Sequence, residues 1–326
     1  MPANRRKNGI GLPAACLLSS VTLAAPAQAQ TVGFDPADYG RAQLPLRQTT
    51  GDAAAFVDQN KGAFEPVAEL DPKDALAVLA RPIGRVDILL KNTRTGQQMG
   101  ASCTGTLLPG DYVLTNHHCL PQSGELTPLK VSILMDYLTL DGKGSRRFEM
   151  EAKPIEFDPR LDYALARVAG HPGEIYGTAR LSGGEIAGNP SMLVIHHPLG
   201  RPKVMSRFRC FAMKEQPDGP DLRHRCDTLA GSSGSLMFEG SVGAVALHKE
   251  GGLDPKDASS FNSATRLNAI LGKSRILAEI AGQPGRPVAA ADPGKPSAAP
   301  AAAAPSGPPA SAPLDPAGMN AVLRGR

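Results

Sequence analysis

Thr228-Leu229-Ala230-Gly231-Ser232-Ser233-Gly234-Ser235-Leu236-Met237-Phe238 has the pattern of a glycine-rich loop that leads into a β-strand. A nucleophilic serine needs such a place. Its hydroxyl must be exposed on a tight turn, backbone N–H groups must face the developing oxyanion, and a base must lie within hydrogen-bond reach. The two glycines permit the turn and the close approach of a substrate. Taken alone, the run is also typical of a flexible linker, so the rest of the chain has to support it.

Short apolar runs separated by Gly, Pro and Asp recur on both sides of this loop. They are residues 86–90, 105–108, 112–115, 131–134, 163–168, 191–195 and 242–247. Runs of this length favour an all-β barrel or sandwich. One helix is expected near the end, with Asn268 as its N-cap and Gly282 as its stop.

Two further segments supply candidate partners for a serine nucleophile. Val113-Leu114-Thr115-Asn116-His117-His118-Cys119 offers two adjacent imidazoles, and an imidazole can take the serine proton and return it to a leaving amine. Leu161-Asp162-Tyr163-Ala164-Leu165 puts a carboxylate at the start of an apolar strand, where it can orient the imidazole and stabilise its cation. An isolated aspartate before a strand is equally typical of a turn, so the segments carry weight only together.

Together these segments resemble the trypsin-like (chymotrypsin-fold) serine peptidases, in the order His, Asp, Ser. Cys103-Thr104-Gly105-Thr106-Leu107-Leu108 is similar to the family's Cys-Gly-Gly-Ser-Leu strand, and Thr115-Asn116-His117-His118-Cys119 to its Thr-Ala-Ala-His-Cys. The second segment is closer still to the Thr-Asn-x-His of bacterial glutamyl endopeptidases. Asp162-Tyr163-Ala164-Leu165 is similar to Asp-Ile-Ala-Leu, and residues 231–235 to Gly-Asp-Ser-Gly-Gly. His196-His197-Pro198-Leu199-Gly200, with Lys203 and Ser206, resembles a segment of bacterial lysyl endopeptidases.

The resemblance covers roughly residues 80–282 and implies a fold and a reaction. The implied fold is all-β, with two six-stranded antiparallel β-barrels, the active site between them and a C-terminal helix. Barrel one spans about residues 79–172 and barrel two about 173–282. The implied activity is that of a serine endopeptidase that forms an acyl-enzyme. The implied catalytic residues are His118, Asp162 and Ser233, with His117 as a bystander and the N–H groups of Gly231 and Ser233 as the oxyanion hole.

Two interpretations of substrate preference compete. Asp227 stands six residues before Ser233, where trypsin carries the carboxylate that binds Lys or Arg. Thr228 and His248 stand where glutamyl endopeptidases carry the residues that bind a Glu side chain. We favour cleavage after Glu or Asp. Ser232 replaces the aspartate that pairs with the freed N-terminus of animal trypsins, so that activation switch is not expected here.

The N-terminal sequence predicts that the protein is exported. A cationic start at residues 5–7 is followed by an apolar stretch, residues 10–25, and by Ala27-Gln28-Ala29, a small-x-small cleavage pattern. Residues 1–29 are therefore expected to be a signal peptide, too short in its apolar part to span a bilayer. Its removal lowers the formal net charge from +4 to about +1, so the basic balance gives no support for a nucleic-acid partner.

The cysteines agree with export. Cleavage leaves four of five: Cys103, Cys119, Cys210 and Cys226. An even number fits two disulfides in an oxidising compartment, and hence a secreted or periplasmic protein. Sequence alone permits three pairings. The local one, Cys103–Cys119 with Cys210–Cys226, closes two similar short loops, and the family resemblance implies its Cys103–Cys119 bridge. No metal or cofactor is expected, because adjacent residues such as His118 and Cys119 do not easily share one tetrahedral zinc ion.

The remaining segments complete the predicted organisation. Residues 30–78 are an N-terminal extension or propeptide, residues 79–282 the peptidase domain, and residues 283–326 a disordered tail rich in Pro and Ala. The expected partners are protein or peptide substrates, with no nucleic acid and no membrane span, and the expected state is a monomer. Two alternatives stay open: a catalytically silent binding protein with a protease fold, and a structural protein displayed through the tail.

Overall fold

The computed structural model describes residues 1, 32–45, 63–240, 243–254 and 256–282. Within these residues the chain is mostly β-strand and forms two antiparallel sheets, which confirms the all-β expectation. The signal peptide expected at residues 1–29, apart from Met1, and the tail expected at 283–326 lie outside the described residues.

The first sheet has the strand order β7-β6-β3-β4-β5-β9-β8, and β1 joins it by pairing with β4. Its strands are β1 (Val32–Phe34), β3 (Ile83–Asn92), β4 (Gln98–Leu108), β5 (Tyr112–Thr115), β6 (Leu126–Met135), β7 (Arg146–Met150), β8 (Glu156–Asp158) and β9 (Tyr163–Arg167).

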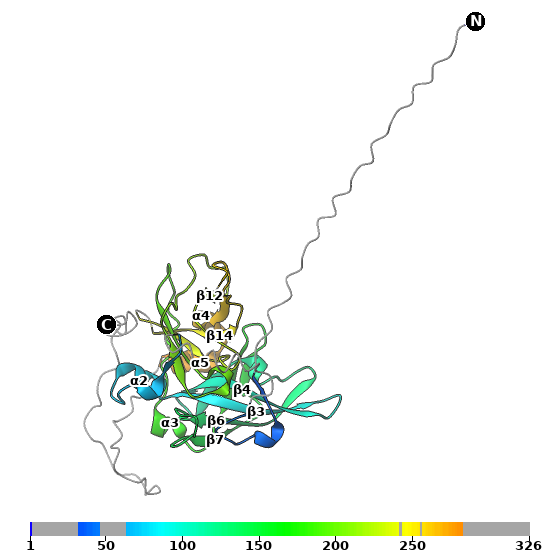
Figure 1. Ribbon diagram of the computed structural model, residues 1–326, viewed down its shortest axis with the longest axis vertical. Helices are drawn as coiled ribbons and strands as arrows, with labels where there is room; N and C mark the ends of the chain where they lie inside the picture. The colour runs from blue at the N-terminus through cyan, green and yellow to red at the C-terminus, as the bar shows by residue number, and fades with distance from the viewer. Residues whose placement is uncertain (2–31, 46–62, 241–242, 255, 283–326) are drawn as a thin grey trace.

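The second sheet has the order β12-β15-β14-β13-β10-β11-β2. Its strands are β2 (Glu65–Pro66), β10 (Met192–His196), β11 (Val204–Ser206), β12 (Asp221–His224), β13 (Leu236–Glu239), β14 (Gly243–Glu250) and β15 (Asn262–Arg266). Figure 1 shows β12 and β14 in the upper part of the molecule and β3, β4, β6 and β7 below them.

Strands β5 and β9 are buried on both faces, and their alternate residues belong to different cores. Val113 and Ala164 pack in the interior of the first sheet. Leu114 and Leu165 lie in a larger core that also contains Leu247 of the second sheet. Because successive side chains of a strand point to opposite faces, the same short strands line one core and join the two sheets. The apolar runs therefore read as continuous rather than alternating.

The strand counts differ from the six per barrel that the resemblance implied. The described residues form eight strands in the first sheet and seven in the second. Two of them, β1 and β2, come from the N-terminal extension, where β1 pairs with β4 and β2 pairs with β11. Apart from β1, the strand order of each sheet is an open path among the described residues. An isolated bridge also joins Met150, the last residue of β7, to Val168, which follows β9.

The expected C-terminal helix is two helices, α4 (Leu267–Lys273) and α5 (Arg275–Ala281). Asn268 is not the N-cap; it lies inside α4, where its amide donates to Glu185, and Arg266 precedes the helix without a side-chain cap. Ser274 is extended and separates the helices, and its Oγ caps α5 by accepting from Leu277 N–H at 3.0 Å. Ser274 stands between Lys273 and Arg275, inside the single helix that the sequence predicted, and its capping role was missed. Gly282 ends α5 as expected.

Two shorter helices complete the described part of the chain: α2 (Ala75–Ala80) and α3 (Pro172–Tyr176). None of the helices among the described residues has the length and apolar character to cross a bilayer.

Both expected disulfides are present. Cys103–Cys119 and Cys210–Cys226 each join residues separated by 16 positions. In the chain-entropy model, closing a loop of this size stabilises the folded state by about 3 kcal/mol.

Arg85 on β3 ties the N-terminal extension to both sheets. Its side chain is fully buried, and Nε and Nη2 donate to the two oxygens of Asp87, each at 2.8 Å. Nη2 also donates to Arg41 O at 2.9 Å, and Nη1 donates to Ala42 O at 2.6 Å and to Gly200 O at 2.8 Å. All five N–H groups of the guanidinium therefore have acceptors. The carbonyls of residues 41–42 and of Gly200 therefore bind the same buried guanidinium.

Replacing Arg85 with methionine should strongly destabilise the fold. The variant removes the bidentate partner of Asp87, which keeps its ion pair with Arg147, and it removes the donor to Ala42 O and Gly200 O. Breaking a buried pair costs up to roughly 3–5 kcal/mol. Urea denaturation measures the free energy of unfolding. The control is Arg275→Ala, since the Arg275–Glu279 pair is exposed (92% and 64% of the two side chains) and should change little. Equal small effects in both variants would contradict the anchoring role of Arg85.

Candidate active site

Ser233 lies in a loop that both sheets hold. Thr104 N–H, from the first sheet, donates to Ser233 O at 2.8 Å, and Thr104 Oγ1 donates to Gly231 O at 2.9 Å. Gly234 N–H donates to His248 O, in the second sheet, at 3.0 Å. Gly234 has a φ of 86°, and a Cβ at this position would collide with Thr104 O. The loop therefore needs a glycine here both for its backbone conformation and for its contact with β4.

His118, just after β5, and Asp162, just before β9, are brought together by the pairing of these two neighbouring strands. Asp162 Oδ2 lies 2.7 Å from His118 Nδ1, and Oδ1 accepts the backbone N–H of His118 at 2.9 Å. Asp162 has a φ of 49°, a conformation that Asp tolerates better than most residues, and Asn116 Nδ2 donates to its carbonyl at 2.7 Å. His117 instead stacks on Phe157, with ring centroids 5.1 Å apart. The assignment of His118 and His117 to different places fits the sequence interpretation.

The Ser233 hydroxyl and the His118 imidazole are not hydrogen-bonded to each other in the described residues. Ser233 Oγ donates to Lys249 O at 3.4 Å, a long and weak contact. His118 Nε2 is buried and has no partner in the described part of the chain. The nitrogen that a catalytic base would use is therefore available.

Two backbone N–H groups flank the Ser233 side chain without an acceptor. Within residues 63–240 and 243–254, the N–H groups of Gly231 and Ser233 form no hydrogen bond, whereas those of Ser232 and Gly234 do. Unpaired N–H groups beside a nucleophile are what an oxyanion requires.

The directions of these two N–H groups are set by carbonyls. A trans peptide is planar, so its N–H points opposite to the carbonyl of the preceding residue. The carbonyl before Gly231 belongs to Ala230 and accepts Leu199 N–H at 2.6 Å. The carbonyl before Ser233 accepts Ser235 N–H at 3.1 Å. Turning either N–H away would break one of these bonds.

The candidate specificity residue His248 is paired with His224, which the sequence analysis missed. His224 Nε2 lies 3.1 Å from His248 Nδ1, and Cys226 N–H donates to His224 Nδ1 at 3.2 Å. Because Nδ1 of His224 accepts, its proton sits on Nε2 and is donated to His248 Nδ1. The proton of neutral His248 therefore sits on Nε2. No sequence motif around His224 predicted this contact, because the contact depends on the pairing of β12 with β15.

The other candidate specificity residues lie on the segment after Cys226. Thr228 Oγ1 accepts Asn262 Nδ2 at 3.0 Å, and the same amide donates to Cys226 O at 2.8 Å. Asp227 is half-buried, and burial raises the pKa of its carboxyl although nearby Arg209 opposes the shift. Among the described residues Asp227 forms no ion pair with His248, whose Nδ1 is occupied by His224.

Cys103, His118 and Cys119 bring three possible metal-ligand atoms within 4.8 Å of one another. Both sulfur atoms belong to the same disulfide, and a disulfide offers no thiolate to zinc. The cluster therefore consists of a structural disulfide that lies beside the His118 imidazole.

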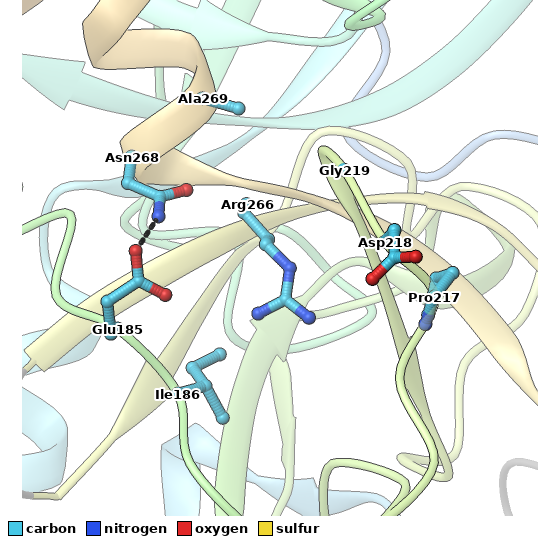
Figure 2. A pocket seen from close by; sticks show the side chains of 8 residues that line it. All are labelled: Glu185, Ile186, Pro217, Asp218, Gly219, Arg266, Asn268 and Ala269. Atoms are coloured by element: carbon cyan, nitrogen blue, oxygen red, sulfur yellow. Dashed lines mark hydrogen bonds between the residues drawn. The ribbon is translucent and has the colours of Figure 1, made fainter.

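A polar hollow of about 510 Å³ lies elsewhere on the second sheet, beside α4. Figure 2 shows Arg266 projecting into it between Glu185 on one side and Asp218 on the other. None of the predicted catalytic residues lines it. The hollow is therefore separate from the predicted catalytic residues.

Comparison with known proteins defines the class. A family model described as "Trypsin-like peptidase domain" matches residues 103–247, which include His118, Asp162 and Ser233. The match confirms the resemblance for these residues, which correspond to a trypsin-like peptidase domain.

Several solved structures share the fold at low identity. The Rv3671c protease from M. tuberculosis in its active form is 19% identical, with 66% of this chain and 87% of that chain covered and a TM-score of 0.45. A Glu endopeptidase in complex with MPD is 17% identical, with 64% and 94% covered and a TM-score of 0.48. The HtrA-type protease AlgW with a decapeptide is 11% identical, with 64% and 68% covered and a TM-score of 0.46. Among curated proteins none matches the chain.

Buried histidines should make the fold sensitive to acid. Burial lowers the pKa of His196 and of His248 to about 3, and it holds the pKa values of His197 and His224 well below their ordinary value. Their ordinary value in the unfolded chain is near 6.5, so unfolding takes up protons once the pH falls below that value. Each such proton lowers the free energy of unfolding by about 1.4 kcal/mol per pH unit.

Urea denaturation between pH 7.5 and 5.5 measures this loss, and His224→Gln should show a shallower pH dependence by one proton. His171 at the surface acts in the opposite direction, because Asp111 raises its pKa. Its contribution is present below pH 6.5 and lost as the pH rises. A free energy of unfolding that stays constant on acidification would contradict the assignment of neutral buried histidines.

Proposed function

We propose that the protein is a secreted or periplasmic serine endopeptidase that hydrolyses peptide bonds through an acyl-enzyme on Ser233. The observation that carries the proposal is the His118–Asp162 pair, in which two hydrogen bonds hold the histidine and leave its Nε2 unpaired. The Ser233 loop supports the proposal. The N–H groups of Gly231 and Ser233 have no acceptor among the described residues, and Thr104 binds the carbonyls of the same two residues.

In the first half of the reaction, Ser233 Oγ exchanges its weak bond to Lys249 O for one to His118 Nε2. Oγ attacks the substrate carbonyl carbon as its proton passes to Nε2, and the carbonyl oxygen becomes an oxyanion. The N–H groups of Gly231 and Ser233 stabilise this charge, each donor contributing about 3 kcal/mol. His118 then gives the proton to the leaving amine, and the C–N bond breaks.

In the second half a water molecule enters where the amine left. His118 takes a proton from the water, whose oxygen attacks the ester carbonyl of the acyl-enzyme. The C–O bond to Ser233 breaks, and the proton returns to Oγ. Asp162 keeps the proton of neutral His118 on Nδ1 throughout, so that Nε2 faces the serine.

Ser233→Ala and Asp162→Asn test the mechanism. Removing the nucleophile should lower kcat by roughly 10⁴- to 10⁶-fold, and Asp162→Asn by roughly 10⁴-fold because the amide favours the wrong imidazole tautomer. The measurement is hydrolysis of a mixed peptide library by the mature, disulfide-bonded protein, with cleavage products identified by mass. Lys249→Ala keeps the backbone carbonyl and serves as the control, with activity retained.

Two outcomes would reject the proposal. Equal hydrolysis by wild type and Ser233→Ala would assign the activity to another group or to a contaminant. No hydrolysis by either, with both disulfides formed, would favour the catalytically silent binding protein.

We further propose a preference for Glu or Asp before the cleaved bond. The support is the His224–His248 pair, which leaves His248 Nε2–H as a buried donor for a carboxylate. Thr228, whose hydroxyl already accepts from Asn262 Nδ2, has its own proton free to donate. The competing Asp227 carboxyl is half-buried with a raised pKa, which weakens it as a partner for Lys or Arg.

His248→Leu tests the preference. Loss of the buried donor should lower kcat/KM for substrates with Glu before the cleaved bond by at least about tenfold, while substrates with Ala there change by less than about threefold. His248→Gln, which retains an N–H donor, is the matched control. Cleavage of the library after Lys or Arg would instead support Asp227.

The proposed location rests on the two disulfides, which persist in oxidising compartments, and on the signal-peptide pattern of residues 1–29. The peptidase is proposed to act as a monomer on protein or peptide substrates.

A further inference from the structure

Ser232, the residue before the nucleophile, begins a chain of buried hydrogen bonds that leads away from the active site. Its Oγ lies 2.7 Å from His196 Nδ1 and accepts Leu229 N–H at 3.1 Å. His196 Nε2 lies 3.1 Å from Ser206 Oγ, and Ser206 Oγ donates to Ala63 O at 3.0 Å. Ser232, His196 and Ser206 are all fully buried.

The protons of this chain have one consistent arrangement. Ser206 spends its only hydroxyl proton on Ala63 O, so toward His196 it can only accept, and the imidazole proton sits on Nε2. Nδ1 then accepts, and Ser232 Oγ–H must donate to it. Every donor has an acceptor and every group is neutral. A protonated His196 would break the pattern, and burial lowers its pKa to about 3.

The far end of the chain lies in the N-terminal extension. Ala63 and Phe64 directly precede β2, which pairs with β11 through Met205 and Glu65. The Phe64 ring covers His196, with ring centroids 5.8 Å apart. The extension is thus attached to the Ser233 loop through side chains as well as through strand pairing.

The His196–Ser232 pair is not a second catalytic dyad. Both residues are fully buried, and the Ser232 hydroxyl already accepts a backbone N–H. His196 has no carboxylate partner, since its other nitrogen faces Ser206. A substrate carbonyl cannot reach Ser232 Oγ without dismantling the loop, so the pair serves structure.

We propose that His196 and Ser206 are positioning residues, which hold the Ser232 side chain and thereby aim the Ser233 N–H at the oxyanion. The inference rests on the proposed function. The carbonyl of Ser232 accepts from Ser235 N–H and from Ser235 Oγ, and the Ser232 side chain is bonded to His196. The peptide that carries the Ser233 N–H is therefore held both at its carbonyl and through the side chain of Ser232. Releasing the side chain frees that peptide to turn.

The test compares Ser232→Ala, His196→Phe and Ser206→Ala with wild type in steady-state peptide hydrolysis. We call the hydrogen-bonded chain Ser232–His196–Ser206 the relay. Because the relay acts on the transition state rather than on substrate binding, kcat should fall at least tenfold in each variant and KM should change less than threefold. Ser182→Ala is the control, since Ser182 Oγ also donates to a backbone carbonyl, that of Ala244 at 2.7 Å, but is not connected to the loop. Unchanged kcat in Ser206→Ala would overturn the relay.

A double-mutant comparison separates the relay from general loosening of the fold. Ser206→Ala should lower kcat in wild type and have no further effect in the His196→Phe background, where the connection is already cut. Equal proportional losses in both backgrounds would overturn the proposal. All rates are measured well below the melting temperature of the least stable variant.

A second measurement needs no variant and no activity. The ¹⁵N shifts of the His196 ring in the wild-type protein should show a neutral imidazole with its proton on Nε2 from pH 5 to 8. A proton on Nδ1, or titration in that range, would overturn the relay even if the variants fail to fold. Failure of the proposed function is distinguishable, because it appears as an inactive wild type with the His196 tautomer as expected.

Discussion

The buried guanidinium of Arg85 is the constraint on which the arrangement of the site depends. It holds Gly200 O at 2.8 Å, and the residue before, Leu199, donates its N–H to Ala230 O. That carbonyl shares a peptide with the Gly231 N–H. Leu199 itself has a φ of 55°, a conformation that surrounding contacts must impose on a leucine. The Arg85 guanidinium in the first sheet therefore helps to set, through Gly200 and Leu199, the direction of the Gly231 N–H in the second.

The two sheets contribute different parts of the chemistry, and a close contact keeps them in register. His118 and Asp162 belong to the first sheet, and Ser233 to the second. Gly234 packs so closely on Thr104 that even a Cβ would collide, and Thr104 in turn bonds Ser233 O and Gly231 O. The Ser233 loop is thus held against the first sheet by backbone and hydroxyl contacts that carry no net charge, whereas His118 is held by the Asp162 carboxylate.

The sequence predicted what local patterns encode. Each of the seven apolar runs overlaps a strand of the described residues, and both disulfides were predicted. Contacts between distant segments were not predictable. β1 and β2 are two or three residues long and exist because β4 and β11 offer edges to pair with. His224 has meaning only opposite His248, and Ser274 breaks a helix that apolar periodicity alone would continue.

Replacing an aspartate by Ser232 changes how the oxyanion loop is held. A buried carboxylate needs a buried cation, and the desolvation of both opposes the gain. Ser232 and His196 instead form a neutral chain in which each hydroxyl and imidazole both donates and accepts. Such a chain needs no newly formed terminal amine. Its remote acceptor is Ala63 O, part of the chain's own extension. Ala63, in the N-terminal extension, therefore supplies the last acceptor of the chain that holds the Ser232 side chain.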